Sequence, residues 1–176
     1  MPYGATEAQV RPGVEKDLGP LTELYNHYVR ETAVTFDTVP FAPGERLPWL
    51  RSHPEDGRHR LLVAQEIPGS RILGYATSSA FRPKAAYETS VEVSVYLAPD
   101  AGGRGIGTQL YKALFEALAT EDVHRAYAGI ALPNEASVRL HERFGFGHVG
   151  TYGEVGRKFG RYWDVAWYEK RLGPTA

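Results

Sequence analysis

Apolar residues along the chain repeat with two different periods, and each period predicts one kind of element. Leucines and tyrosines between residues 14 and 31 recur at helical spacing, as on the buried face of a helix. The stretch SVEVSVYLAP (90–99) instead alternates apolar and polar residues, which indicates a strand that ends at Pro99. Similar patterns predict helices at 46–53, 106–122 and 133–145, and strands near Val10 and at 60–66, 71–80, 125–132 and 162–172.

This order of elements predicts an α/β fold in which strands outnumber helices. The turn IPGS (67–70) is expected to join two strands as a hairpin. Asn134 is expected to cap the helix that follows it, and Gly145 to end that helix. No repeat or linker divides the chain, and 176 residues with 43% hydrophobic content suit one core. We therefore expect a single domain over 1–176, with a core at about 8–172 and short flexible ends.

Charge, cysteine content and the first residues narrow the class of protein. The net charge of -1, with acids and bases interspersed, predicts no nucleic-acid partner. There is no cysteine for disulfides or nucleophilic catalysis, and the histidines lack metal-ligand spacing, so we expect no metal. The N-terminus lacks a targeting pattern, and no apolar run approaches the roughly 20 residues that span a bilayer. We expect a cytoplasmic protein, without membrane association, that binds a small molecule.

Glycines crowd the stretch LAPDAGGRGIGTQLY (97–111), between a predicted strand and a predicted helix. Such a turn directs backbone N–H groups and the positive end of the helix dipole at one point, which favours a phosphate. Alternatively, the glycines only tighten the turn. The loop lacks the Gly-Lys-Ser/Thr of a P-loop, and it does not follow the first strand as a dinucleotide fold requires.

The segment GGRGIGTQL after VSVYLAP resembles the pyrophosphate loop of the GNAT N-acetyltransferases, whose pattern is Gln/Arg-x-x-Gly-x-Gly/Ala. Gly105 and Gly107 match this pattern, whereas Gly102 replaces the usual Gln or Arg. The segments NHYVRETAVTFDT, AAYETSVEVSVYLAP, ALPNEASVRLHERFGF and GRKFGRYWDV occur in the same order as in the phosphinothricin and methionine sulfoximine acetyltransferase branch. The resemblance runs from about Val10 to Leu172. It implies the GNAT fold, a central mixed and mostly antiparallel sheet flanked by helices, and acetyl-CoA as co-substrate.

The resemblance also implies which residues hold acetyl-CoA. They belong to the strand before the glycine loop, to the loop itself and to the helix at 133–145. They are Val95, Tyr96, Leu97, Gly102, Gly103, Arg104, Gly105, Ile106, Gly107, Thr108, Asn134 and Ser137.

Acetyl transfer from a thioester to an amine needs a base for the ammonium and a proton donor for the departing thiolate. Glu92 matches the glutamate of the family's VE-x-S-VYV segment, so the resemblance implies that it is the base. By spacing alone Glu92 would be a solvated carboxylate, and Glu88 is a weaker competitor. His141 stands where many relatives have a tyrosine donor and where the branch has histidine. It is expected to be the acid or a contact to acetyl-CoA, with a structural role as the alternative.

The loop FRPKAAYE (81–88) resembles the Arg-x-Arg-x-Ala-Tyr segment of the branch, which implies that it binds the acceptor. Lys84 replaces the second arginine, keeping the charge but losing the bidentate fork. Phe36 matches an aromatic residue of the acceptor pocket, although core packing would explain it equally. The predicted acceptor residues are Phe36, Arg82, Pro83, Lys84, Tyr87, Val93 and Ser94.

These features predict an enzyme that acetylates the amino group of phosphinothricin, methionine sulfoximine, methionine sulfone or a similar molecule. The alternatives are another amine, such as a peptide N-terminus, a polyamine or an aminoglycoside, and a non-catalytic CoA-binding module. Trp163 and Trp167 lie on the same side of the predicted last strand, as interface or as core. The resemblance favours a homodimer in which the GRKFG loop (156–160) borders the partner's acceptor site.

Overall fold

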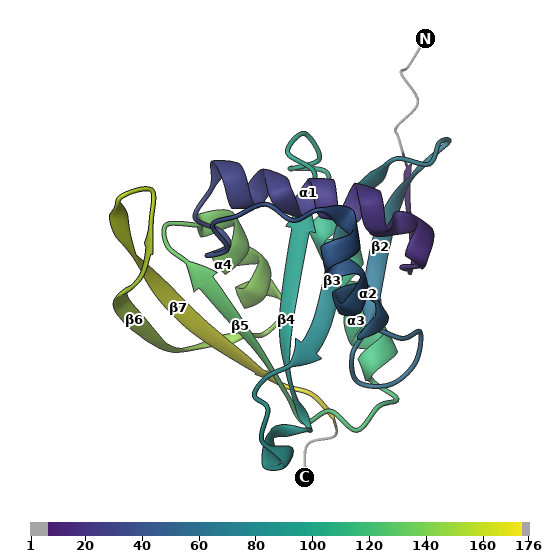
Figure 1. Ribbon diagram of the computed structural model, residues 1–176. Coiled ribbons are helices and arrows are strands. Elements are labelled where there is room, and N and C mark those ends of the chain that lie inside the picture. Colours follow the sequence, from purple (N-terminus) through teal and green to yellow (C-terminus); the bar gives the residue numbers. More distant parts are fainter. Residues whose placement is uncertain (1–6, 174–176) are drawn as a thin grey trace.

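Strand β4 (Ser90–Leu97) is the middle strand of a seven-stranded sheet in the computed structural model, which describes residues 7–173 (Figure 1). The strand order is β1-β2-β3-β4-β5-β7-β6, and every neighbouring pair is antiparallel except β4 and β5. The other strands are β1 (Glu7–Pro12), β2 (Leu61–Ile67), β3 (Ile72–Ala80), β5 (Arg125–Ala131), β6 (Gly147–Lys158) and β7 (Arg161–Arg171). The predicted mixed, mostly antiparallel α/β fold is confirmed. The short ends predicted outside 8–172 fall mainly on residues 1–6 and 174–176, which lie outside the described residues.

Helices cover both faces of the sheet (Figure 1). On one face, rings of α1 and α2 contact rings of the sheet, Tyr25 against Tyr96 and Trp49 against Tyr75. On the other face α3 and α4 lie together, with the ring of Phe115 5.7 Å from the ring of Phe144. The helices are α1 (Leu18–Glu31), α2 (Leu47–Arg51), α3 (Ile106–Leu118) and α4 (Glu135–Arg143), with short 3-10 turns η1 (Glu15–Asp17), η2 (Pro43–Arg46) and η3 (Ala85–Tyr87).

The alternation in β4 divides its side chains between these two faces. Val91 and Val93 are buried in the core, which also contains the apolar side chains of α3. Glu92 and Ser94 point to the opposite face, below α1 and α2, and are only half-buried. A strand with one apolar and one polar side therefore places a carboxylate at the centre of the sheet without burying it fully.

Strands β4 and β5 begin side by side and then diverge. The backbone N–H of His124 donates to the carbonyl of Thr89 at 2.8 Å, which joins the starts of the two strands. The parallel pairing covers only residues 90–92 of β4 and 125–127 of β5. Beyond Glu92 the strands separate, as Figure 1 shows. The sheet is therefore open between β4 and β5 toward their carboxyl ends.

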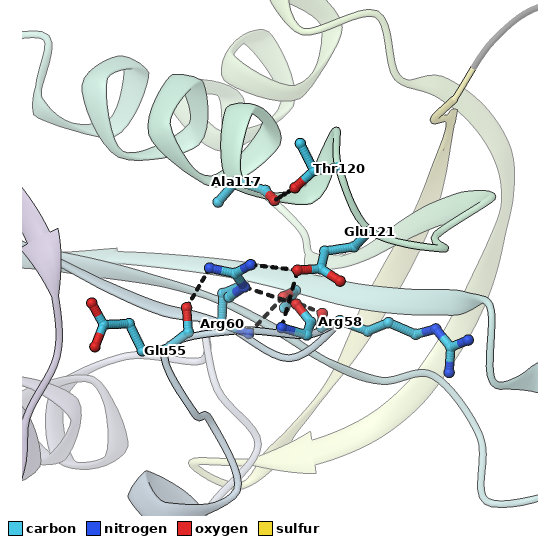
Figure 2. Close-up of polar contacts among 8 residues, drawn as sticks. Glu55, Arg58, Arg60, Ala117, Thr120 and Glu121 are labelled. Carbon is cyan, nitrogen blue, oxygen red and sulfur yellow. Dashed lines mark hydrogen bonds and ion pairs between the residues drawn. The ribbon is translucent and has the colours of Figure 1, made fainter.

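An arginine stabilises the end of the sheet at which β4 and β5 begin side by side. Figure 2 shows Arg60, just before β2, between Glu55 and Glu121. Its guanidinium donates to Glu121 Oε1 at 2.6 Å, to the carbonyl of Gly57 at 2.8 Å and to the carbonyl of Glu55. Glu121 also accepts from the N–H of Gly57 at 3.1 Å. Because Glu121 belongs to the turn between α3 and β5, this network ties the loop before β2 to the start of β5.

The sequence patterns predict the remaining elements well but miss β6. The hairpin of β2 and β3 is confirmed, as are the cap at Asn134, whose Oδ1 accepts from the N–H of Ser137 at 3.2 Å, and the stop at Gly145, where φ is +84°. Strand β6 has no regular alternation, because its pairing with β7 shifts register after His148 and again after Tyr152. Each shift moves the following side chains relative to the sheet, which removes the period that a sequence pattern would reveal.

Candidate active site

The gap between β4 and β5 forms the centre of the candidate site. A small cavity of about 50 Å³ lies there, and we call it the inter-strand cavity. It is lined by side chains and backbone of both strands and by one face of α4. Its lining residues are Val34, Val93, Ser94, Val95, Tyr96, Tyr111, Ala128, Gly129, Ile130, Ala131, Asn134, Ser137 and His141. The unpaired edge of β4 offers backbone hydrogen bonds to a ligand that enters here.

The glycine loop leads from the end of β4 to the start of α3. Gly103 and Gly105 both have φ near +73°, in the left-handed region that glycine adopts readily, and Gly105 is the N-cap of α3. A Cβ added at Gly102, Gly103 or Gly105 would meet no atom within 4 Å, so the backbone is open to approach. Gly107 differs, because a Cβ there would lie 3.4 Å from Leu140 of α4. The loop thus combines an accessible backbone with the N-terminus of a 13-residue helix, as an anion site requires.

Glu92 lies in a wider cleft on the side of the sheet that faces α1. This cleft has a volume of about 400 Å³, and we call it the Glu92 cleft. Its walls come from the segment after α1, from β4 and β5, and from the β6–β7 hairpin. The lining residues are Val34, Thr35, Phe36, Arg82, Glu92, Ser94, Tyr96, Gly129, Ala131, Tyr152, Val155, Val165 and Trp167. Ser94, Tyr96 and Gly129 line both this cleft and the inter-strand cavity, so the two spaces adjoin.

The surroundings of Glu92 favour its neutral form. Burial raises the pKa of the Glu92 carboxyl, and the positive charge of Arg82 partly opposes this effect. Burial likewise raises the pKa of Tyr96 to about 12, so its hydroxyl keeps its proton near neutral pH. A carboxylate whose pKa is raised accepts a proton from an ammonium group more readily than an exposed one.

A second cavity, of about 350 Å³, lies under α1 and α2, and Glu92 lines it too. Arg46 lines it, with its guanidinium 4.3 Å from the ring centre of Tyr25 and 3.9 Å from that of Trp49. This cation is 7% exposed and stacks between the two rings, which compensates part of the cost of its burial. The stacking links α1 to α2, and Tyr25 in turn contacts Tyr96 of β4.

His141 lies on the opposite side of the sheet from Glu92, at the inter-strand cavity. It is 3% exposed, and burial lowers its pKa, although the hydrogen bond to the carbonyl of Ser137 opposes this. Nδ1 lies 2.7 Å from that carbonyl, which only accepts, so Nδ1 carries the proton. Nε2 lies 2.8 Å from the hydroxyl of Tyr111 and accepts from it in the neutral ring. Both ring nitrogens are therefore engaged, and the ring is held as one tautomer.

The four predicted acceptor residues of the loop 81–88 share one hollow, and of them only Arg82 also lines the Glu92 cleft. Arg82 lines the Glu92 cleft, where its guanidinium lies 4.3 Å from the ring of Phe81. Pro83, Lys84 and Tyr87 instead line a separate hollow of about 610 Å³, together with Arg82. Glu88 lies there too, 3.8 Å from Arg58, and does not line the Glu92 cleft.

The other predicted residues divide between the two sides of the sheet. Phe36 and Ser94 line the Glu92 cleft. Val93 is 3% exposed and points to the α3 side, away from Glu92, so only the inter-strand cavity brings it near the site. Val95, Tyr96, Asn134 and Ser137 line that cavity as well. Leu97 ends β4, and its carbonyl accepts a hydrogen bond from Tyr28.

The sequence patterns did not point to several residues of the site. Tyr152, Val155 and Trp167 line the Glu92 cleft, but the first two belong to the unpredicted β6. Tyr111 was part of the predicted helix at 106–122, yet nothing in its spacing indicates that it contacts His141. Its neighbours in the chain, Leu110 and Leu114, are ordinary core positions.

The described residues also bear on metal sites and on membrane association. Within residues 7–173, no three His, Asp or Glu side chains gather closely enough to hold a metal ion. None of the helices in that range combines the length and the apolar character needed to cross a membrane.

Comparisons with known proteins agree with this geometry. Residues 11–167 match the family model described as an acetyltransferase (GNAT) domain. The chain belongs to the GNAT acetyltransferase family. It is 73% identical over 169 residues to a phosphinothricin N-acetyltransferase of Streptomyces coelicolor, with 96% of this chain and 99% of the relative covered. It is 34% identical over 168 residues to an L-methionine sulfoximine/L-methionine sulfone acetyltransferase of Pseudomonas paraeruginosa, with 96% of each covered.

A solved structure resembles this GNAT acetyltransferase over most of its length. It is a GNAT superfamily phosphinothricin acetyltransferase from Sinorhizobium meliloti in complex with acetyl-CoA, with a TM-score of 0.89 and 32% identity. The similarity covers 94% of this chain and 89% of that chain. The predictions of a GNAT fold and of an acetyltransferase are thereby confirmed.

Proposed function

We propose that this acetyltransferase moves an acetyl group from acetyl-CoA to the amino group of a small amino-acid-like molecule, of the phosphinothricin, methionine sulfoximine or methionine sulfone type. The observation that carries the proposal is the position of Glu92. It is a half-buried carboxylate in a cleft that adjoins the gap between β4 and β5. The names of the two relatives supply the class of acceptor.

The residues around the gap fit acetyl-CoA, which supplies the acetyl group as an activated thioester. The open backbone at Gly103 and Gly105, with the N-terminus of α3, would hold the pyrophosphate. Arg104 of the same loop, and Ile106 and Thr108 of the first turn of α3, would lie beside it. The residues of the inter-strand cavity named above, with Leu97, would hold the pantetheine arm. The thioester would then reach the Glu92 side of the sheet through the gap.

Glu92 is proposed as the base for the amine, and Arg82 as the partner of the acceptor's carboxylate. The two line the same cleft, and the charge of Arg82 acts on the pKa of Glu92. An ammonium group between them loses its proton to Glu92 directly or through a water molecule, which frees the lone pair for attack. Lys84 lies in the neighbouring hollow, so it would act on the acceptor only through the field of its charge.

His141 is proposed as a residue that shapes the acetyl-CoA site, with no role as the acid. Its Nδ1 proton is directed at the carbonyl of Ser137, and its Nε2 accepts from Tyr111. Neither nitrogen can give a proton to a thiolate without losing a buried hydrogen bond, which would cost about 1–3 kcal/mol. The departing thiolate of CoA is instead expected to take its proton from water or from the acceptor.

A thiol-release assay with acetyl-CoA and a panel of amines tests the proposed activity. We expect release of CoA thiol with phosphinothricin, methionine sulfoximine and methionine sulfone, at kcat/KM values of roughly 10⁴ M⁻¹s⁻¹ or more for a physiological acceptor. Release only with peptides, polyamines or aminoglycosides would contradict the acceptor class. Binding of acetyl-CoA without any release would favour the non-catalytic alternative.

The β6–β7 hairpin supports the proposal of a homodimer. Val149, Tyr152, Val155, Phe159 and Tyr162 are each more than half exposed, although all are large and apolar or aromatic. Strand β6 is also an edge of the sheet, and Tyr152 and Val155 line the Glu92 cleft. A second copy on this hairpin would cover the apolar side chains and narrow the mouth of the cleft.

Light scattering at micromolar concentration should give about twice the mass of the 19.5 kDa chain. Changing Val149 to glutamate should lower this mass toward that of one chain, because a charge would be buried in the interface. Val149 shares a hollow of about 310 Å³ with Arg82, so the mass, and not the KM of the amine, decides this test. A single-chain mass in a fully active sample would contradict an obligate dimer.

A further inference from the structure

Lys158, the last residue of β6, buries its ammonium group without a salt bridge among the described residues, although the charge of Asp37 acts on it. The side chain is 5% exposed, and within residues 7–173 it forms no ion pair. Its Nζ donates to the carbonyl of Thr35 at 2.8 Å and, more weakly, to the carbonyl of Tyr28 at 3.5 Å. The ring of Phe159, 5.2 Å from Nζ, and the charge of Asp37 add support, but the hydrogen bonds of this ammonium go to backbone carbonyls alone. Burying a cation without a salt bridge is costly. The charge therefore points to a purpose beyond packing.

The carbonyls that Lys158 binds belong to the end of α1 and to the loop that follows it. Tyr28 lies in the last turn of α1, where the negative end of the helix dipole favours a cation. Thr35 belongs to residues 32–39, which we call the acceptor loop because Val34, Thr35 and Phe36 line the Glu92 cleft. The loop contains neither helix nor strand, so no backbone ladder holds it in place.

The same hairpin holds the acceptor loop at a second point. The ring of Phe36 lies directly over Gly156, where an added Cβ would come within 2.1 Å of Phe36 Cε2. No side chain larger than hydrogen fits below the ring. Gly156 also resumes the pairing with β7 directly after the second register shift of β6. The hairpin therefore contacts the loop through one hydrogen-bonded cation and one close backbone approach, two residues apart.

We propose that Lys158 and Gly156 are positioning residues that fix the acceptor loop, and with it Phe36, over Glu92. This inference rests on the proposed function for its kinetic consequence. Val34, Thr35 and Phe36 of the acceptor loop all line the Glu92 cleft, whereas only Val34 also lines the inter-strand cavity. The hairpin is therefore expected to affect the affinity for the amine more than the affinity for acetyl-CoA. No contact of Lys158 among those described reaches the glycine loop or the inter-strand cavity.

Changing Lys158 to methionine tests the first contact, because methionine keeps the length of the side chain and removes the ammonium. We expect the KM of the amine to rise about tenfold, since binding must then order the loop, with kcat and the KM of acetyl-CoA within about threefold of the original. Lys16, an exposed lysine of η1, gives the matched control Lys16→Met, which should leave both KM values unchanged. Equal rises in both KM values would overturn the proposal.

Hydrogen exchange provides a readout that needs no substrate. The amides of residues 32–39 should exchange about tenfold faster in Lys158→Met than in the original protein or in Lys16→Met. If no amine is acetylated, the proposed function fails, and exchange alone decides this inference. Unchanged exchange in the loop would overturn it.

A double-mutant cycle tests the second contact and does not require Lys158→Met to fold. Gly156→Ala should raise the KM of the amine by displacing Phe36. In a Phe36→Ala background the same change should have little further effect, because the ring it displaces is gone. Additive effects of the two changes would show that Gly156 acts independently of Phe36 and would overturn this part of the proposal.

Discussion

Glu92→Gln should lower the turnover number by about 100-fold or more at neutral pH, as expected for loss of a positioned general base. Glutamine keeps the shape of the side chain in the Glu92 cleft but takes no proton from an ammonium group. The affinity for acetyl-CoA should change little, because the glycine loop lies at the far end of β4. Steady-state kinetics with the best amine, together with calorimetry for acetyl-CoA, measures both quantities.

The pH dependence of kcat/KM gives a second test of Glu92 as the base. Burial raises the pKa of Glu92, and only the deprotonated form acts as base, so kcat/KM should rise with pH through that raised pKa. In Glu92→Gln this rise should disappear, leaving the titration of the amine itself. Glu88→Gln is the matched control, because it removes a carboxylate from the hollow outside the Glu92 cleft. An undiminished rate in Glu92→Gln, or an equal loss in Glu88→Gln, would move the role elsewhere.

Patterns along the sequence predicted the elements whose form depends on neighbouring residues alone. In β4 the regular alternation placed Glu92 on the polar side, and the structure has it there. The glycine loop was equally evident, because a left-handed backbone at Gly103 and Gly105 is a property of those residues. Strand β6 escaped prediction because its two register shifts remove the alternation.

Contacts between distant segments could not be predicted from the patterns. Tyr111 reaches His141 across 30 positions, and Lys158 reaches Thr35 across 123. Neither partner is defined until the sheet brings α3 next to α4 and the hairpin next to the acceptor loop. The same reason explains Arg82 and Lys84. The resemblance placed them in one loop and one role, whereas in the fold only Arg82 lines the Glu92 cleft and Lys84 lines the neighbouring hollow.

The second large effect is expected from a substitution in the glycine loop. Gly105→Val should weaken acetyl-CoA binding by roughly tenfold to hundredfold, the equivalent of the 1–3 kcal/mol cost of holding a bulky residue in a left-handed conformation. Space is not the obstacle, since an added Cβ at Gly105 meets nothing within 4 Å. The obstacle is the φ of +73° at the N-cap of α3. If valine relaxes to a negative φ, the first N–H groups of α3 turn away from the pyrophosphate.

A control for backbone strain separates this effect from a general loss of stability. Gly57 also has a left-handed φ, +86°, and open space around its Cβ position, but it lies in the loop before β2. Gly57→Val should therefore lower the thermal midpoint by a similar amount while leaving the affinity for acetyl-CoA unchanged. Calorimetric titration of both variants with acetyl-CoA, beside their thermal unfolding, makes the comparison. If Gly105→Val binds acetyl-CoA as tightly as Gly57→Val does, the backbone of this loop does not hold the pyrophosphate. The glycines would then serve only to tighten the turn between β4 and α3.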